Sequence, residues 1–205
     1  MRSSRLDVRL PRVLVATGAH EPLRLPPIGD VGVLYRDIEL PSLLGSALST
    51  AAPKAVDLDT VRGLQADEDG VAFILERLSI QIMITRRPQT AERVAEIGGL
   101  ALLHTFAFDS TGVSRALDSL PRSLGIGAVV SPGLVLPHML PSEVQRLPRP
   151  LLAYGLIMEP DDIEACLALA DGVVLGLDVA TAQASVLAAA LGEPANPGRN
   201  PTRRS

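Results

Sequence analysis

The sequence has few aromatic residues and almost no cysteine or lysine. Among 205 residues there are no tryptophans, two tyrosines, three phenylalanines, one cysteine and one lysine. A single Cys166 excludes an internal disulfide, and we expect an inert, buried thiol in a reducing cytoplasm. With so few aromatic rings the chain has no evident platform on which nucleic-acid bases could stack.

Long hydrophobic runs are also missing. No apolar run is long enough to span a bilayer. The run that follows the basic N-terminus covers only residues 13–16, which is too short for the core of a signal peptide. We therefore expect a cytoplasmic protein without membrane contacts. Hydrophobic residues nevertheless make up 47% of the chain and charged residues 20%, which predicts a globular fold with a sizeable core.

Positive charge is in excess only at the two ends of the chain. Residues 1–12 carry four arginines and one aspartate, or +3, and residues 193–205 carry three arginines and one glutamate, or +2. Since the whole chain is −4 with neutral histidines, residues 13–192 carry −4 − 3 − 2 = −9. An acidic body of this kind does not attract phosphate backbones unless it has a local basic patch.

Eight short apolar runs follow one another, most of them separated by a helical pattern. We predict strands at 13–16, 31–35, 55–58, 80–85, 100–106, 128–130, 151–153 and 173–175. We predict helices at 40–48, 67–78, from 88, at 113–120, from 159, and at 181–191. Parallel strands with crossover helices follow from this alternation, and eight units close into a single (β/α)8 barrel of the TIM type. A doubly wound open sheet is the alternative.

The barrel is expected to occupy residues 13–191. Residues 1–12 then form a basic N-terminal extension, and residues 192–205 form a tail rich in proline, glycine and arginine, which we expect to be mobile.

Two acids, Asp57 and Asp59, end the third predicted strand. Side chains two apart in a strand point to the same face, so we expect both carboxylates to project together at the edge where barrel sites lie. Two interpretations remain open. Either at least one acid is functional, or one caps the loop and the other is solvated.

The segment that begins at Asp59 resembles a known protein family. The pattern D-x-x-x-G-x-x-x-D-x-x-G-x-x-F, held by Asp59, Gly63, Asp67, Gly70 and Phe73, resembles the glycerol-3-phosphate-responsive antiterminator family. Four further family motifs occur in the same order, after predicted strands four to seven: Thr85-Arg86, Phe106-x-x-Asp109-Ser110, Pro132-Gly133 and Ala153-x-Gly155-Leu156-Ile157. The resemblance extends over roughly residues 31 to 178.

This resemblance implies a regulator on an enzyme-like barrel. It would sense glycerol 3-phosphate and, when loaded, act on leader mRNA of glycerol-utilisation genes to prevent transcription termination. It implies no enzymatic activity and no cofactor beyond the phosphorylated effector, and the oligomeric state stays open. A phosphorylated ligand needs arginines, backbone N–H groups and helix N-termini. The candidate ligand-binding residues are Asp59, Arg62, Gly63, Thr85, Arg86, Asp109, Gly133, Gly155 and Gly176. No metal site is predicted.

Several positions depart from the family pattern. Tyr154 replaces a glycine after the seventh strand, and Gly176-Leu177-Asp178 replaces small hydroxyl residues after the eighth. His104 stands where the family has an arginine. A tyrosine fills space left for an oxyanion, and a carboxylate repels it. We therefore hypothesise that the ligand differs from glycerol 3-phosphate, or that its binding is weakened or lost.

Two other function classes remain as alternatives. In a small phosphosugar isomerase or epimerase, Asp57 and Asp59 would serve as an acid–base pair or hold a divalent cation. In a plain interaction scaffold, the arginine-bearing ends would contact RNA while the acidic body stays clear.

Overall fold

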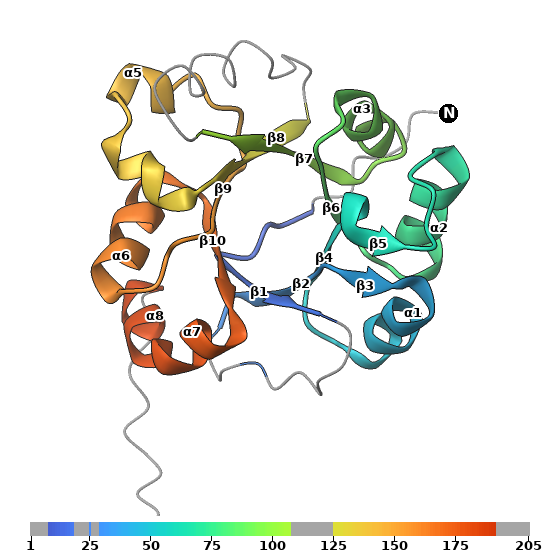
Figure 1. The fold of residues 1–205 in the computed structure, drawn as a ribbon, viewed down its shortest axis with the longest axis horizontal. Helices are drawn as coiled ribbons and strands as arrows, with labels where there is room; N and C mark the ends of the chain where they lie inside the picture. The colour runs from blue at the N-terminus through green and yellow to red at the C-terminus, as the bar shows by residue number, and fades with distance from the viewer. Residues whose placement is uncertain (1–7, 19–24, 26–28, 108–124, 192–205) are drawn as a thin grey trace, which may run out of the picture.

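Eight parallel strands close into a barrel in the computed structural model, which describes residues 8–18, 25, 29–107 and 125–191. Each strand pairs with its neighbours round the ring, and β10 closes it by pairing with β1 (Figure 1). The ring consists of β1 (Val13–Thr17), β2 (Val31–Tyr35), β4 (Lys54–Asp57), β6 (Ile82–Thr85), β7 (Leu100–Phe106), β8 (Ile126–Ser131), β9 (Leu151–Tyr154) and β10 (Gly172–Gly176). The predicted (β/α)8 barrel is confirmed and the open sheet is excluded.

All eight predicted strands match strands of the ring, two of them at both ends and the others with ends that differ by at most two residues. Strands of a parallel barrel are covered on both faces, by the lumen inside and by helices outside, so each one reads as a continuous apolar run. That is why short runs of valine, leucine and isoleucine were sufficient to locate them.

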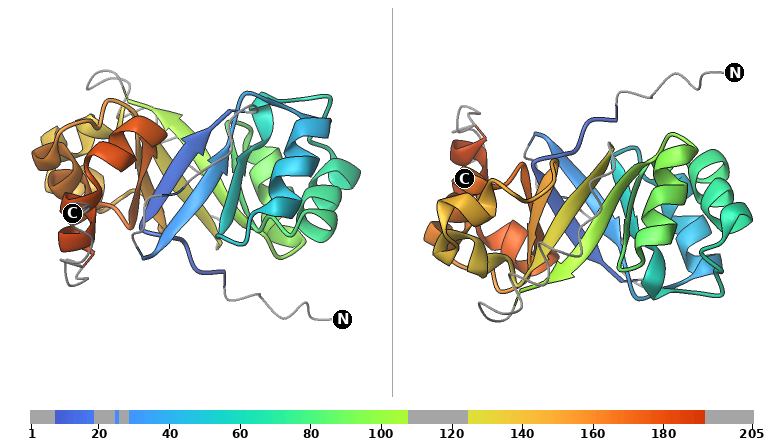
Figure 2. Two further views of the ribbon diagram at one scale, coloured as in Figure 1. Left: turned by 90° about the horizontal axis from the view of Figure 1, so that it is seen from below. Right: turned by 90° about the horizontal axis from the view of Figure 1, so that it is seen from above.

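The helices pack outside the ring, as Figures 1 and 2 show. They are α1 (Leu40–Ser49), α2 (Glu68–Arg77), α3 (Pro88–Glu96), α5 (Pro141–Val144), α6 (Pro160–Leu169), α7 (Leu177–Ala182) and α8 (Ala184–Ala190), with a 3-10 segment η2 (Gly133–His138). The single helix predicted at 181–191 is wrong, because α7 begins directly after β10 and the chain turns at Gln183 before α8 begins. The predicted helix 113–120 and the predicted tail 192–205 lie outside the described residues. Of the helices described, none is both long enough and apolar enough to cross a membrane.

The lumen of the barrel is filled by apolar side chains. One cluster takes residues from all eight strands: Leu14, Leu34, Ala55, Ile82, Ile84, Leu102, Val129, Leu152 and Val174. Three of its leucines lie in register with a glycine of the neighbouring strand, in the pairs Leu14–Gly32, Leu102–Gly127 and Leu152–Gly172. A Cβ atom on any of these glycines would lie within 2.9 Å of the leucine Cδ2. The glycines therefore make the room that the leucines fill.

A second, much smaller sheet lies beside the barrel. It pairs β3 (Ile38–Glu39) with β5 (Val61–Arg62) and links the segments that follow β2 and β4. Two-residue strands carry no periodicity, so this sheet could not be predicted from the sequence.

Candidate functional site

Polar side chains form the floor of the barrel mouth, at the carboxyl ends of the strands. Asp57, His104 and Tyr154 each lie two residues beyond a position of the apolar lumen cluster. Because side chains alternate along a strand, these three also point inward. The floor of the mouth therefore consists of an acid, an imidazole and a phenol above packed leucines.

Asp57 and Asp59 do not project together, and the prediction that they would is wrong. β4 ends at Asp57, and the chain then turns into a 3-10 segment, η1 (Leu58–Thr60). The Asp57 carboxylate accepts a hydrogen bond from the Asp59 N–H at 3.2 Å, which caps this turn. Asp57 consequently stays on the floor of the mouth, while the Asp59 side chain contacts the end of β6.

The carboxyl group of Asp57 has a pKa raised to about 6. Burial is the main cause, since the residue is only 7% exposed and water cannot stabilise the charge. The Asp59 N–H and the charges of Arg86 and Arg36 lower the pKa, whereas the Asp59 carboxylate raises it. Near pH 6 this group is therefore half protonated, and it can both donate and accept a hydrogen bond.

The Asp59 carboxylate joins the loop after β4 to the loop after β6. Its side chain is 1% exposed. Oδ2 accepts hydrogen bonds from the Arg86 N–H (2.6 Å) and the Thr85 hydroxyl (3.2 Å), and the Arg86 Nε lies at 3.4 Å. Oδ1 lies 3.3 Å from the Arg87 Nε, an ion pair that lacks hydrogen-bond geometry. Three of the predicted ligand residues, Asp59, Thr85 and Arg86, are thus in direct contact.

His104 is held as a neutral ring with a defined tautomer. Its Nε2 lies 2.8 Å from the Ser131 hydroxyl, which donates its own proton to the Tyr154 carbonyl at 3.0 Å. A hydroxyl has one proton to give, so Nε2 carries the hydrogen and Nδ1 is left as an acceptor. Burial, followed by the charges of Arg86 and Arg36, lowers the pKa of His104 to about 4.

Two arginines stand over this floor. The Arg36 guanidinium lies 5.4 Å from the centroid of the Tyr154 ring, and its Nε donates to the Asp37 carboxylate at 2.7 Å. Arg36 and Arg86 both affect the pKa of Asp57 and of His104, so both charges lie near the floor. Each of these arginines also has a carboxylate partner, Asp37 for Arg36 and Asp59 for Arg86.

The loops after β8, β9 and β10 offer little to an anion. The Gly133 N–H donates to the Gly155 carbonyl at 3.0 Å and is already used. A Cβ on Gly176 would lie 2.7 Å from the Asp178 Oδ1, so a carboxylate lies beside the end of β10. Tyr154 packs against the lumen cluster, and its buried hydroxyl has no hydrogen-bond partner among the residues that the structure describes.

The remaining predicted ligand residues lie apart from the floor of the mouth or outside the description. Arg62 belongs to β5, where its exposed Nε donates to the Glu39 carboxylate at 2.6 Å. Gly63 follows it with a φ of 86°, a conformation that favours glycine. Gly155 likewise has a φ of 88°. Asp109 falls outside the described residues. The roles of all the predicted ligand residues stay predictions.

Among the described residues, no group of three or more His, Cys, Asp or Glu side chains is arranged so that it could hold a metal ion. Cys166 is buried, as predicted, and lies 3.6 Å from the Gly133 carbonyl. Burial raises the pKa of its thiol to about 11, which leaves it unreactive at neutral pH.

Solved structures with the same fold include regulators and enzymes. A glycerol uptake operon antiterminator regulatory protein from Listeria monocytogenes aligns with a TM-score of 0.66 and 18% identity over 83% of this chain and 95% of that one. An antiterminator-related protein from Thermotoga maritima gives 0.62 and 20% identity over 84% and 99%. A triosephosphate isomerase from Bartonella henselae gives 0.52 and 14% identity over 89% and 100%. At these identities the likeness concerns the fold alone.

The family itself is assigned from the sequence. No curated protein matches the chain. The family model described as "Glycerol-3-phosphate responsive antiterminator" matches residues 32–178, which is most of the chain and includes the segment from Asp59 to Phe73. The chain therefore belongs to the glycerol-3-phosphate responsive antiterminator family.

Proposed function

We propose that this chain is a cytoplasmic transcription antiterminator that binds a small phosphorylated effector at the barrel mouth and acts on leader mRNA of glycerol-utilisation genes. Family membership supports the regulatory role. The single structural observation in its favour is the pair of arginines at the mouth: Arg36 lies 5.4 Å from the centroid of the Tyr154 ring, and the Arg86 Nε lies 3.4 Å from the Asp59 carboxylate. The regulator needs no cofactor besides the effector.

The anionic end of the effector would lie between Arg36 and Arg86. Guanidinium groups bind phosphate oxygens through charge-assisted hydrogen bonds. The floor below them supplies groups for hydroxyls, since Asp57 both accepts and donates near pH 6 and the His104 Nδ1 accepts. A phosphorylated polyol matches this arrangement of charge and hydrogen-bonding groups.

This position differs from the usual phosphate site of such barrels, which is built by the loops after the last two strands. Here Tyr154 occupies the mouth beside one of those loops, and the Asp178 carboxylate lies beside the other. We therefore propose that the effector site has diverged and that glycerol 3-phosphate binds weakly or gives way to another phosphorylated molecule.

One observation favours a second candidate function, a phosphosugar isomerase. A buried carboxylic acid with a pKa of about 6 is suited to proton transfer near neutral pH. Against it, Asp59 is bound to Thr85, Arg86 and Arg87 and is not available as the second member of an acid–base pair. The enzyme hypothesis predicts turnover of a phosphosugar that is lost in Asp57→Asn, whereas the regulator predicts none.

Two measurements test the proposal together. In calorimetric titration we expect the wild-type chain to bind glycerol 3-phosphate more weakly than micromolar, and binding of any phosphorylated polyol to be lost in Arg36→Gln or Arg86→Gln. In a reporter with a terminator in a glycerol-operon leader, the chain should raise transcript readthrough. Micromolar affinity for glycerol 3-phosphate would overturn the divergence of the site, and unchanged readthrough would overturn the regulatory role.

A further inference from the structure

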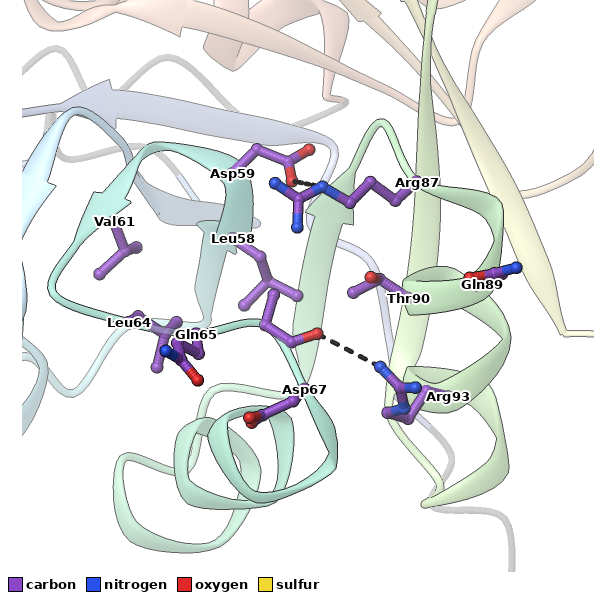
Figure 3. Close-up of a pocket in the computed structure, with 11 residues that line it drawn as sticks. Leu58, Asp59, Val61, Leu64, Gln65, Asp67, Arg87, Gln89, Thr90 and Arg93 are labelled. Atoms are coloured by element: carbon purple, nitrogen blue, oxygen red, sulfur yellow. Dashed lines mark hydrogen bonds and ion pairs between the residues drawn. The ribbon is translucent and has the colours of Figure 1, made fainter.

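A pocket of about 530 Å³ lies beside the barrel mouth, between the segment from Leu58 to Asp67 and helix α3 (Figure 3). It is separate from the lumen, which the leucine layer fills. None of the four residues proposed to contact the effector, Arg36, Asp57, Arg86 and His104, lines this pocket. Its residues come from the loop after β4 and from the first turns of α3, which meet only in the folded chain.

The α3 wall of this pocket carries two arginines with spare donors. Arg87 directs its Nε at Asp59, and Arg93 donates from Nη1 to the Ala66 carbonyl at 3.4 Å. A guanidinium has five N–H groups, so most donors of both arginines have no partner among the described residues. Gln89 also lines the pocket, although its amide points away from the two arginines in Figure 3. The α3 wall is a surface that suits a phosphate group.

The opposite wall and the floor have a different chemistry. Gln65 and Asp67 stand across from α3, as Figure 3 shows. One oxygen of Asp67 accepts the Gly70 N–H at 2.9 Å and caps α2, which leaves its second oxygen as an acceptor. Between the walls lie the apolar side chains of Leu58 and Leu64. A flat ring can lie on such a floor with its polar edge toward an amide and a carboxylate.

We propose that this pocket takes one nucleotide of the RNA on which the regulator acts. The phosphate would bind Arg87 and Arg93, and the base would lie over the apolar floor with its edge toward Gln65 and Asp67. Proteins read single-stranded RNA in this way, by hydrogen bonds to the base edge and by contacts with guanidinium planes. The inference rests on the proposed function.

Asp59 connects this pocket with the effector site. Its Oδ2 holds Arg86 at the mouth, and its Oδ1 faces Arg87 in the pocket. An effector that draws the Arg86 side chain toward its phosphate removes one cation from the carboxylate and strengthens the hold of that carboxylate on Arg87. The position of Arg87, and with it the affinity for RNA, therefore depends on occupancy of the mouth.

The test compares Arg93→Gln with the matched control Arg77→Gln, in the full-length chain. Arg77 is exposed in the last turn of α2 and does not line the pocket, so the control removes the same charge elsewhere. Affinity for a short, fluorescent, random-sequence RNA would be measured by anisotropy at several salt concentrations. We expect Arg93→Gln to weaken binding about fivefold or more and to lower the salt slope by about one, and Arg77→Gln to weaken it less than about twofold. Arg93→Lys should restore part of the loss.

Equal effects of Arg93→Gln and Arg77→Gln would overturn the pocket assignment. A competing source of the same chemistry is a free nucleotide, so the four ribonucleoside 5′-monophosphates would be titrated as well. Should Arg93→Gln abolish their binding and leave RNA affinity intact, the pocket takes a small molecule and the RNA assignment is wrong. Failure of the proposed function is recognised separately, because the wild-type chain would then bind no RNA and give no readthrough.

Discussion

Replacing Asp57 by asparagine should make the protein more stable at alkaline pH. The pKa of this carboxyl group is 3.8 in its reference state and about 6 in the folded chain. The folded chain therefore binds the proton more tightly than the unfolded chain, and ionising Asp57 opposes folding. The stability that protonated Asp57 provides is fully present below pH 3.8 and is lost as the pH rises through 6.

The size of the effect follows from the shift. A change of about two units at about 1.4 kcal/mol per unit amounts to about 3 kcal/mol at pH 8. Asparagine keeps an oxygen that can accept the Asp59 N–H, so the cap of the 3-10 turn survives. Since a buried amide also has some desolvation cost, we expect Asp57→Asn to gain about 1–3 kcal/mol at pH 8 and close to nothing at pH 4.

Urea denaturation of both proteins at pH 4 and pH 8 measures this difference. Asp69→Asn, a change of the same charge at an exposed position of α2, should stay within about 0.5 kcal/mol of wild type at both pH values. A variant that is less stable than wild type at pH 8, or equally shifted at both pH values, would show that burial does not raise the Asp57 pKa. If Asp57→Asn is more stable than wild type and also loses effector binding, then Asp57 lowers the stability of the protein but is needed for binding.

Three further substitutions test other contacts. His104→Gln should reduce the loss of stability between pH 6.5 and pH 4 by up to about 3 kcal/mol, because the pKa of His104 falls from 6.5 to about 4 on folding and charging the half-buried ring favours unfolding. An unchanged pH profile of urea midpoints would contradict this. In thermal melts, Gly133→Ala should lower the free energy of unfolding by about 1–3 kcal/mol, because its Cβ would lie 2.6 Å from the Tyr154 backbone nitrogen. Gly45→Ala in α1, which has open space around it, should raise that free energy by about 0.5–1 kcal/mol. Thr85→Val should cost about 1–3 kcal/mol, since its fully buried hydroxyl donates to Asp59 and accepts the Arg87 N–H, and an unshifted urea midpoint would mean that these bonds do not matter.

The strands could be predicted because each one is an apolar run bounded by polar or turn residues, and the order of the family motifs identified the fold. The turn at Leu58–Thr60 could not. Strand spacing favoured an extended chain through Asp59, but the Asp57 side chain caps the next turn and ends the strand two residues earlier. Helix α7 was likewise missed, because it begins at Leu177, directly after the last residue of β10, with no loop to separate the strand from the helix.

Contacts in the candidate site could be predicted only where both contacting residues belong to family motifs. Asp59, Thr85 and Arg86 belong to family motifs, and the fold brings them into contact. Arg93 and Gln65 belong to none, and no spacing in the sequence links a loop residue to a helix residue 28 positions later. Their proximity depends on how α3 packs beside the loop after β4, which is a tertiary property.

The solid lumen limits how a bound effector can be sensed. With leucines seated against glycines across three strand pairs, nothing can pass along the axis, and the end of the barrel opposite the mouth receives no direct contact from a ligand. A signal must therefore travel sideways, from one rim loop to the next. The shared carboxylate of Asp59 is such a lateral link, so the surface that reports effector binding should be sought around the rim.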